Sequence, residues 1–331
     1  MRRALLGMLA ACGILGAAPA FACVNAFDDR LAIARDDPAE IAVIMSELEK
    51  AYAAKPTLEN SSDLGVARLL IGNYDDAIKL LRETEERFPG NAKVAANLGT
   101  ALELKGVDEE ALKWIREGVI RDASEHYGSE WLHARVLEAK IALKANPQWF
   151  DKNSVLGLDF GPDDVPVAPE ILPIEKGKLK GATDLIKQID YQLAERTKFV
   201  RPPDPFVGDL NASVGDLMIA GGLSALDTGV LDVSPDSYYE EALRYGAPHA
   251  DLIRKRLARY QADLAKGPKP KPKTEAKVQA PSDVVDYPVP PKEQPMNRAL
   301  FYGIAFAIVL ASVGITAFLL RAPRRRSDSK V

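Results

Sequence analysis

Identical residues recur in this chain at an interval of 34 positions, and this repeat constrains the fold more than any other feature of the sequence. The recurring pairs are Leu64 and Leu98, Gly65 and Gly99, Gly72 and Gly106, and Ala77 and Ala111. Tyr74 precedes the first alanine, and Pro89 closes the first unit. A period of this length indicates repeated supersecondary units that bury their apolar surfaces by stacking on one another.

The glycines of the repeat indicate how each unit folds. Gly65 and Gly99 lie among apolar residues at helical spacing, and they are predicted to let two antiparallel helices pack closely, facing the alanine of the same unit. Gly72 and Gly106 are predicted to form the turn between the two helices, because a positive φ angle costs glycine little. Each unit is therefore expected to be a helical hairpin.

This pattern resembles the tetratricopeptide repeat (TPR) family over residues 58–145, with the clearest units at 58–91 and 92–125. The chain departs from the family in lacking an aromatic residue early in each unit, and in having Thr84 and Gly118 where the family usually has alanine. The resemblance implies an all-α fold, a helical solenoid of stacked helix pairs. It also implies a protein-binding module, and we expect no cofactor, no metal ion and no catalytic residue.

Members of this family usually bind a partner along a concave face lined by the first helix of each unit. On this chain the resemblance places the following residues on that face: Ser62, Val66, Leu69, Lys93, Asn97, Thr100, Glu103, Glu130 and Ala134. Lys93 and Asn97 match a clamp that binds carboxylate groups in some family members. Ser62 and Val66 depart from the clamp, which argues against a C-terminal carboxylate as the ligand.

The sequence on both sides of the repeat predicts further helices, so residues 23–265 are expected to form one helical domain. Apolar residues at helical spacing predict helices at 38–54, 132–143, 182–197, 214–226, 237–245 and 250–264. Pro, Gly and Asp are frequent between residues 147 and 175, which predicts an irregular loop there.

The first 22 residues have the pattern of a secretory signal peptide. Arg2 and Arg3 precede a short apolar run, and small residues end at Ala22. Cleavage after Ala22 would leave Cys23 first, and lipidation of that cysteine is an open alternative, although the residues before it depart from the usual lipoprotein pattern.

A second hydrophobic segment lies near the other end of the chain. Residues 299–320 contain no charged side chain, and as a helix they would be ~33 Å long, enough to cross a bilayer. The basic residues of the 321–331 tail predict a cytoplasmic C-terminus, with the preceding domain outside. A stripe of small residues on this segment is compatible with a homodimer formed through the membrane: Gly303, Ala307, Ala311 and Gly314.

Residues 266–298 connect the helical domain to this segment. Repeated proline, as in the stretch 267–273, favours polyproline II and predicts a semi-rigid linker that holds the domain away from the membrane.

Few residues suggest a chemical reaction. The chain has a net charge of −4, which argues against binding to nucleic acid. His126, Glu130 and His133 have the spacing of metal ligands on one helix face, but Gly128 and Ser129 are expected to mark the helix start and displace His126. Structural histidines are therefore the favoured interpretation.

These features together predict a scaffold or adaptor in the inner membrane of a bacterium, with a single transmembrane helix and a periplasmic domain that binds another envelope protein or peptide. Two alternatives remain open. One is a metal-dependent hydrolase that uses the 126–210 region. The other is a surface protein whose C-terminal helix is a cleavable sorting signal.

Overall fold

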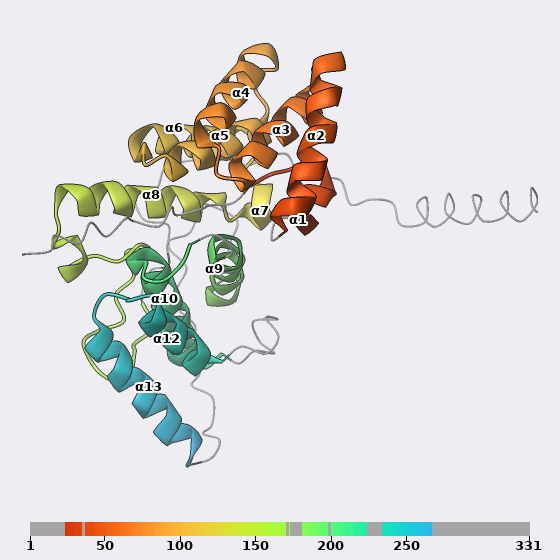
Figure 1. Ribbon diagram of the computed structural model, residues 1–331. Coiled ribbons are helices and arrows are strands. Elements are labelled where there is room, and N and C mark those ends of the chain that lie inside the picture. Colours follow the sequence, from red (N-terminus) through yellow and green to blue (C-terminus); the bar gives the residue numbers. More distant parts are fainter. Residues whose placement is uncertain are drawn as a thin grey trace, which may run out of the picture. The chain divides into compact units, whose positions relative to one another are not determined.

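The computed structural model describes residues 24–34, 37–169, 172, 181–197, 200–223 and 234–266. Within these ranges the regular structure is helical, with no strand, which confirms the all-α prediction (Figure 1). All of these residues belong to one compact unit of the chain.

The predicted signal peptide, the stripe of small residues, the transmembrane segment and the basic tail lie outside the described residues, as does the linker except for Lys266. In the part of the chain that the structure describes, no helix has both the length and the hydrophobicity that crossing a membrane requires.

The described chain begins with a non-helical segment, Val24–Asp28, followed by α1 (Asp29–Ala34) and α2 (Pro38–Ala54). α2 coincides with the helix predicted for 38–54. Its start is set by Asp37, whose carboxylate accepts hydrogen bonds from two N–H groups of the first turn, and by the proline that follows. The apolar stripe of α2 packs in a core shared with α1 and α3.

Two helical hairpins follow in the chain. The first consists of α3 (Leu58–Leu70) and α4 (Tyr74–Arg87), and the second of α5 (Ala92–Leu104) and α6 (Asp108–Arg121). Every helix boundary of the second hairpin lies 34 residues after its counterpart in the first. α5 packs against α3, α4 and α6, so the two hairpins are neighbours in one helical array.

The turns inside the two hairpins are closed in the same way. Gly72 and Gly106 adopt φ angles of +83° and +82°, in the left-handed region that the predicted turns require. The next residues, Asn73 and Val107, donate their N–H groups to carbonyl oxygens five residues earlier, at 2.9 Å in both turns. These bonds satisfy carbonyl groups that a helix end leaves without an intrahelical partner.

Gly65 and Gly99 lie at the closest contacts between the paired helices. A Cβ atom on Gly65 would lie 2.8 Å from the Leu81 side chain, and one on Gly99 would lie 2.7 Å from that of Ile115. The side chains that need this space therefore belong to Leu81 and Ile115. Each of these contacting residues lies four positions, about one helical turn, after the repeat alanine, and both alanines are buried in the same core.

α8 (Glu130–Ala145) includes the third helix predicted from the repeat, and a single turn, α7 (Glu125–Gly128), precedes it. In α7, His126 and Tyr127 have φ angles of 51° and 57°. This left-handed conformation is unusual for residues with a Cβ atom and costs about 1–2 kcal/mol per residue.

The region predicted as an irregular loop, 147–175, is described through residue 169 and at Leu172. Apart from one 3₁₀ turn, η1 (Trp149–Asp151), its described residues form no regular structure. It is nevertheless part of the hydrophobic core, where its buried apolar side chains pack with those of α8, α9 and α10.

The remaining described helices are α9 (Ala182–Thr197), α10 (Pro205–Gly221), α12 (Pro235–Arg244) and α13 (Ala250–Leu264). α9 and α13 have the boundaries predicted for them, and α12 begins two residues before its predicted start at 237. α10 packs against both α9 and α12.

The prediction of a helix at 214–226 was wrong at both ends. α10 begins nine residues earlier because Asp204 caps it, accepting hydrogen bonds from Phe206 N–H at 3.0 Å and Val207 N–H at 2.8 Å, and because Pro205 suits the first helical position. The helix ends where Gly222 turns left-handed, with φ at 60°. The prediction followed the apolar run and overlooked the cap.

Candidate functional site

The segment Val24–Asp28 is held by side chains from the first helices of the two hairpins, α3 and α5. Asn97, on α5, accepts a hydrogen bond from the N–H of Asn25 and donates one to its carbonyl oxygen, both at 2.7 Å. An amide that pairs with both backbone groups of one residue fixes the position and direction of that residue. Asn97 is buried, and its Nδ2 also donates to the Ser62 hydroxyl on α3 at 3.3 Å.

Asp63 and Lys93 hold the next residues of the segment. The two oxygens of the Asp63 carboxylate accept hydrogen bonds from the N–H groups of Phe27, at 2.7 Å, and Asp28, at 2.9 Å. Burial raises the pKa of Asp63 to about 6, although these two hydrogen bonds oppose the rise. The Lys93 ammonium donates to the Ala26 carbonyl at 3.3 Å and lies 4.7 Å from the centre of the Phe27 ring.

Eight of the nine residues predicted to line the concave face are buried, each no more than 2% exposed. They are Ser62, Val66, Leu69, Asn97, Thr100, Glu103, Glu130 and Ala134. Lys93 is the one partly exposed member of the set. These eight side chains are therefore not accessible on an open surface, and four polar members of the set, Ser62, Asn97, Glu103 and Glu130, bind other groups of the same chain. Contact of these residues with a partner stays a prediction.

Glu103 of α5 is the centre of a buried cluster of charges. Its carboxylate lies 2.6 Å from His133 Nε2 and 3.0 Å from Lys140 Nζ, both on α8, and it accepts a hydrogen bond from Arg196 Nη2 on α9 at 2.7 Å. Glu103, His133 and Arg196 have almost no exposed surface. The cluster therefore joins the second hairpin to α8 and α9.

Glu130 extends this cluster toward α7. One of its oxygens lies 2.6 Å from His126 Nδ1, and the other lies 3.1 Å from His133 Nδ1. Each histidine thus contacts a buried carboxylate, and His133 lies between two of them. Because every member of the Glu103–His133–Glu130–His126 series contacts a group that takes the opposite charge, the series is suited to structural pairing.

The pKa values in this cluster shift toward the charged forms. Burial favours the neutral form of Glu103, but Arg196, Lys140 and His133 outweigh it and hold the pKa of Glu103 well below its usual range. The pKa of Glu130 is lowered as well, because both histidines outweigh its burial. Burial opposes protonation of the histidines, yet the adjacent glutamates raise the pKa of His126 and of His133.

The sequence predicted that His126 would be displaced from Glu130 and His133, but the structure keeps it in this cluster. α8 begins at Glu130, close to the predicted start, yet the left-handed backbone of His126 and Tyr127 keeps the imidazole in contact with Glu130. Among the described residues, no group of three or more His, Cys, Asp or Glu side chains is placed to hold a metal ion.

The repeat-defining residues form the interior of the hairpins and their turns. Leu64, Ala77, Leu98 and Ala111 are no more than 1% exposed, and Tyr74 packs against the same core. Gly65 and Gly99 lie at helix contacts, Gly72 and Gly106 lie at the turns, and Pro89 is exposed after the end of α4. Their burial, packing and turn geometry show that these positions support the fold.

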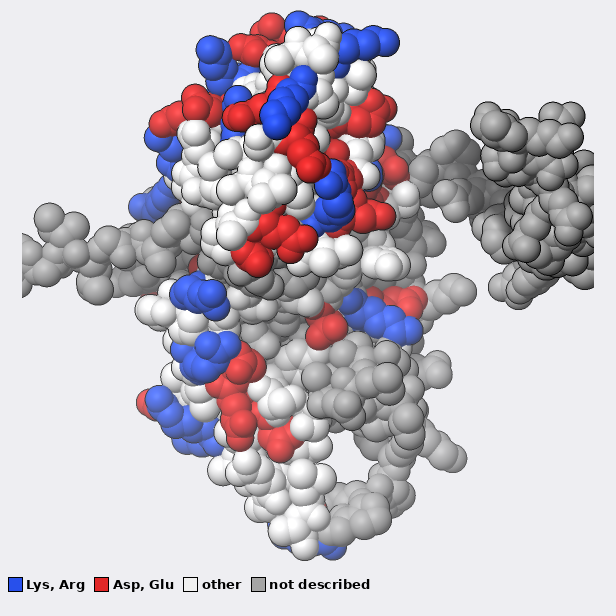
Figure 2. Space-filling view, turned by 45° about the vertical axis from the view of Figure 1, so that its right-hand side comes forward, with Lys and Arg blue, Asp and Glu red and all other residues white. Residues whose placement is uncertain are grey.

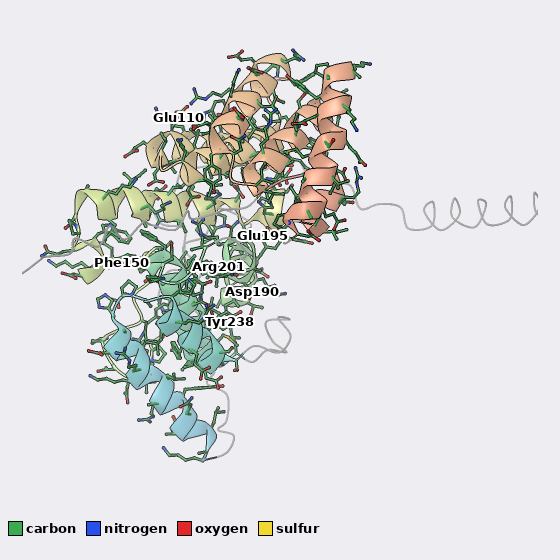
Figure 3. All side chains as sticks on the ribbon, viewed as in Figure 1. Glu110, Phe150, Asp190, Glu195, Arg201 and Tyr238 are labelled. Atoms are coloured by element: carbon green, nitrogen blue, oxygen red, sulfur yellow. The ribbon has the colours of Figure 1, made fainter. Side chains whose placement is uncertain are left out.

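A second polar cluster joins the last helices. Asp216 of α10 lies 2.5 Å from Arg256 Nη1 on α13 and accepts a hydrogen bond from the Tyr239 hydroxyl on α12 at 2.6 Å. Nearby, Tyr238 of α12 donates to Asp190 of α9 at 2.7 Å, and both are labelled in Figure 3. These bonds connect α10 with α12 and α13, and α12 with α9.

Sequence reasoning missed Asp63 and Arg196, which both hold segments distant in sequence. Arg196 did carry a signal, because it continues the helical stripe of Leu185, Ile189 and Leu193 and is therefore a charged residue at a core position. Asp63 had a weaker signal as an acidic residue just before the glycine contact of α3.

Comparison of the chain with protein-family models gave no match. Comparison with curated proteins also gave no match.

Proposed function

We propose that this protein is a binding module of the bacterial envelope, with a TPR-like helical domain tethered outside the cytoplasmic membrane by its C-terminal helix. One observation carries the proposal: the second helical hairpin reproduces the first at an interval of 34 residues, with the same turn geometry and the same glycine contact. Stacked hairpins of this kind present continuous surfaces to other proteins.

The chemistry of the described site also favours binding. Asp63 and Asn97 use a carboxylate and an amide to hold backbone groups, and the carboxylates of Glu103 and Glu130 are engaged by basic side chains. Figure 2 shows basic and acidic side chains interspersed over one face of the molecule, which favours recognition by specific contacts over attraction by one sign of charge.

The location in the envelope is supported by the sequence. Residues 1–22 carry the signal-peptide pattern, and residues 299–320 are an uncharged span followed by arginines. The proline-rich linker between the helical domain and this span would allow the domain to reach partners away from the bilayer. The partner is another envelope protein or a peptide segment of one.

Site-specific photo-crosslinking in native membranes tests this proposal. A photoreactive residue replaces Lys93, the partly exposed residue of the predicted face, and the control variant carries it at Lys113, exposed on the outer helix α6. We expect one defined crosslinked partner from position 93 and none of that product from position 113. No product from position 93, or the same products from both positions, would contradict the proposal.

A further inference from the structure

The contacts that hold Val24–Asp28 on α3 and α5 involve its backbone. Asn97 binds the N–H and carbonyl of Asn25, Asp63 binds two N–H groups, and Lys93 binds one carbonyl. Every residue except proline offers the same backbone groups. Another non-helical peptide therefore meets the requirements of this face as well as the chain's own segment does.

The side chain of Asn25 contributes little to this binding. It is buried, yet its Nδ2 has no hydrogen-bond partner in the structure. A buried donor without a partner opposes binding, since it has lost its water and gained nothing in exchange. The segment therefore fits the face imperfectly, as expected of an occupant that a better ligand replaces.

Val24 and Ala26 pack against the hydrophobic clusters, and the aromatic ring of Phe27 makes a directional contact with the face. It lies beneath the Lys93 ammonium, in a cation–π arrangement. We therefore expect the face to prefer a ligand with an aromatic side chain two residues after the residue that Asn97 binds.

The segment and α1 are held by different contacts. Val24 and Ala26 pack against the hydrophobic cores, and the backbone of the segment is bound by Asp63, Asn97 and Lys93. α1 has its own anchors, because Leu31 and Ala34 are buried in a core with side chains of α2 and α3. Displacement of residues 24–28 would break the contacts of the segment and expose the polar groups that bind it, while these anchors of α1 remain.

We propose that Asp63, Lys93 and Asn97 form a peptide-binding site, which Val24–Asp28 occupies within the same chain and from which a non-helical peptide of the partner, carrying an aromatic residue, displaces it. This inference rests on the proposed binding function, for which it names the ligand and a means of regulation. The chain's own segment keeps the site closed until a competing peptide is present.

Two substitutions of Asn25 distinguish the contribution of its backbone N–H from that of its side chain. Asn25→Pro removes the N–H that Asn97 binds, whereas Asn25→Ala keeps both backbone groups and removes the side-chain amide, whose Nδ2 has no partner. The probe is a fluorescein-labelled peptide with the sequence of residues 24–34, added to the mature full-length chain in detergent. Fluorescence anisotropy measures its binding, and hydrogen exchange measures protection of the Phe27 and Asp28 amides.

We expect the Asn25→Pro variant to bind the peptide about tenfold more tightly than the wild-type chain or the Asn25→Ala variant, with faster exchange at both amides. The same peptide carrying Phe27→Ala is expected to bind several-fold more weakly. Equal peptide binding by the Pro and Ala variants, or unchanged protection of the amides in the Pro variant, would overturn the inference.

A negative result of the peptide experiment can be distinguished from failure of the proposed function. If position 93 still crosslinks a defined partner in membranes while the peptide result is negative, the binding function stands and the competition between internal and external peptide is wrong. If both fail, the proposed function fails with it.

Discussion

Glu103 has a buried carboxylate that His133, Lys140 and Arg196 contact together. Burying a charge is costly, and the cost is offset only while its partners remain in place. Single substitutions in this cluster are therefore expected to have large effects on the free energy of unfolding.

Replacing this carboxylate by an amide tests how much the cluster stabilises the fold. We expect Glu103→Gln to lower the free energy of unfolding by about 3–5 kcal/mol, because it leaves buried positive charges without their counter-charge. The control is Glu110→Gln, which breaks an exposed pair with Arg82 and should cost less than about 1 kcal/mol. Glu110 is labelled in Figure 3. Urea titration of both variants measures the difference, and equal losses would refute the role of the buried cluster.

A second residue-scale prediction concerns pH and Asp209 of α10. This carboxylate is buried and accepts a hydrogen bond from Val155 N–H at 2.7 Å, and burial raises its pKa from 3.8 to about 7. A raised carboxyl pKa means that the folded state holds its proton longer than the unfolded state, so stability falls as pH rises from about 4 through about 7.

The Asp209→Asn variant should escape this loss, because its amide is neutral at every pH and can still accept the Val155 hydrogen bond. We expect it to be more stable than the wild-type chain at pH 8 by roughly 1–4 kcal/mol, and the two to converge near pH 4. Thermal or urea unfolding across this pH range provides the measurement. A constant difference between the two proteins at all pH values would contradict the pKa assignment.

At the scale of the helix, three glycines of the hairpins lie in different surroundings. A Cβ atom on Gly99 would meet the backbone nitrogen of Ile115 at 3.0 Å as well as its side chain, whereas at Gly65 the three nearest atoms all belong to the Leu81 side chain. A Cβ atom on Gly118 would meet nothing closer than 3.4 Å. Alanine substitutions at these positions should therefore differ in sign and size.

We expect Gly99→Ala to destabilise the protein by about 1–3 kcal/mol, because a backbone atom moves aside less readily than a side chain. Gly65→Ala should cost less, and Gly118→Ala should be neutral or stabilising by up to about 1 kcal/mol through its helix propensity. Chemical denaturation of the three variants gives this ranking. A loss at Gly118 as large as that at Gly99 would show that the packing of the second hairpin is not as described.

The same scale shows how far the sequence predicts the structure. Hairpin boundaries were predictable because glycine at a turn and small residues at a helix contact act within one unit. The contact of Asn97 with Asn25 could not be predicted, because the two residues are 72 positions apart. The group that Asn97 binds is a backbone amide, which every residue except proline has, so the sequence does not indicate which one is bound. For the same reason a partner-binding concave face was expected where the chain places its own segment.

At the scale of the whole molecule, two polar clusters connect elements that are distant in sequence. The Glu103 cluster joins α5, α8 and α9, and the Asp216 cluster joins α10, α12 and α13. The proposed function adds a membrane tether to this helical domain. The orientation of the chain in the membrane determines which partners the helical domain can reach. That orientation is the claim on which the account depends most.

Protease treatment of spheroplasts tests this claim directly. The full-length chain carries an epitope tag after Val331, and protease is added to the outside of intact spheroplasts. The account predicts that cleavage releases the helical domain, while the tag stays protected on a short membrane-bound fragment until the membrane is permeabilised. Loss of the tag before the helical domain is cut, or protection of both, would contradict it.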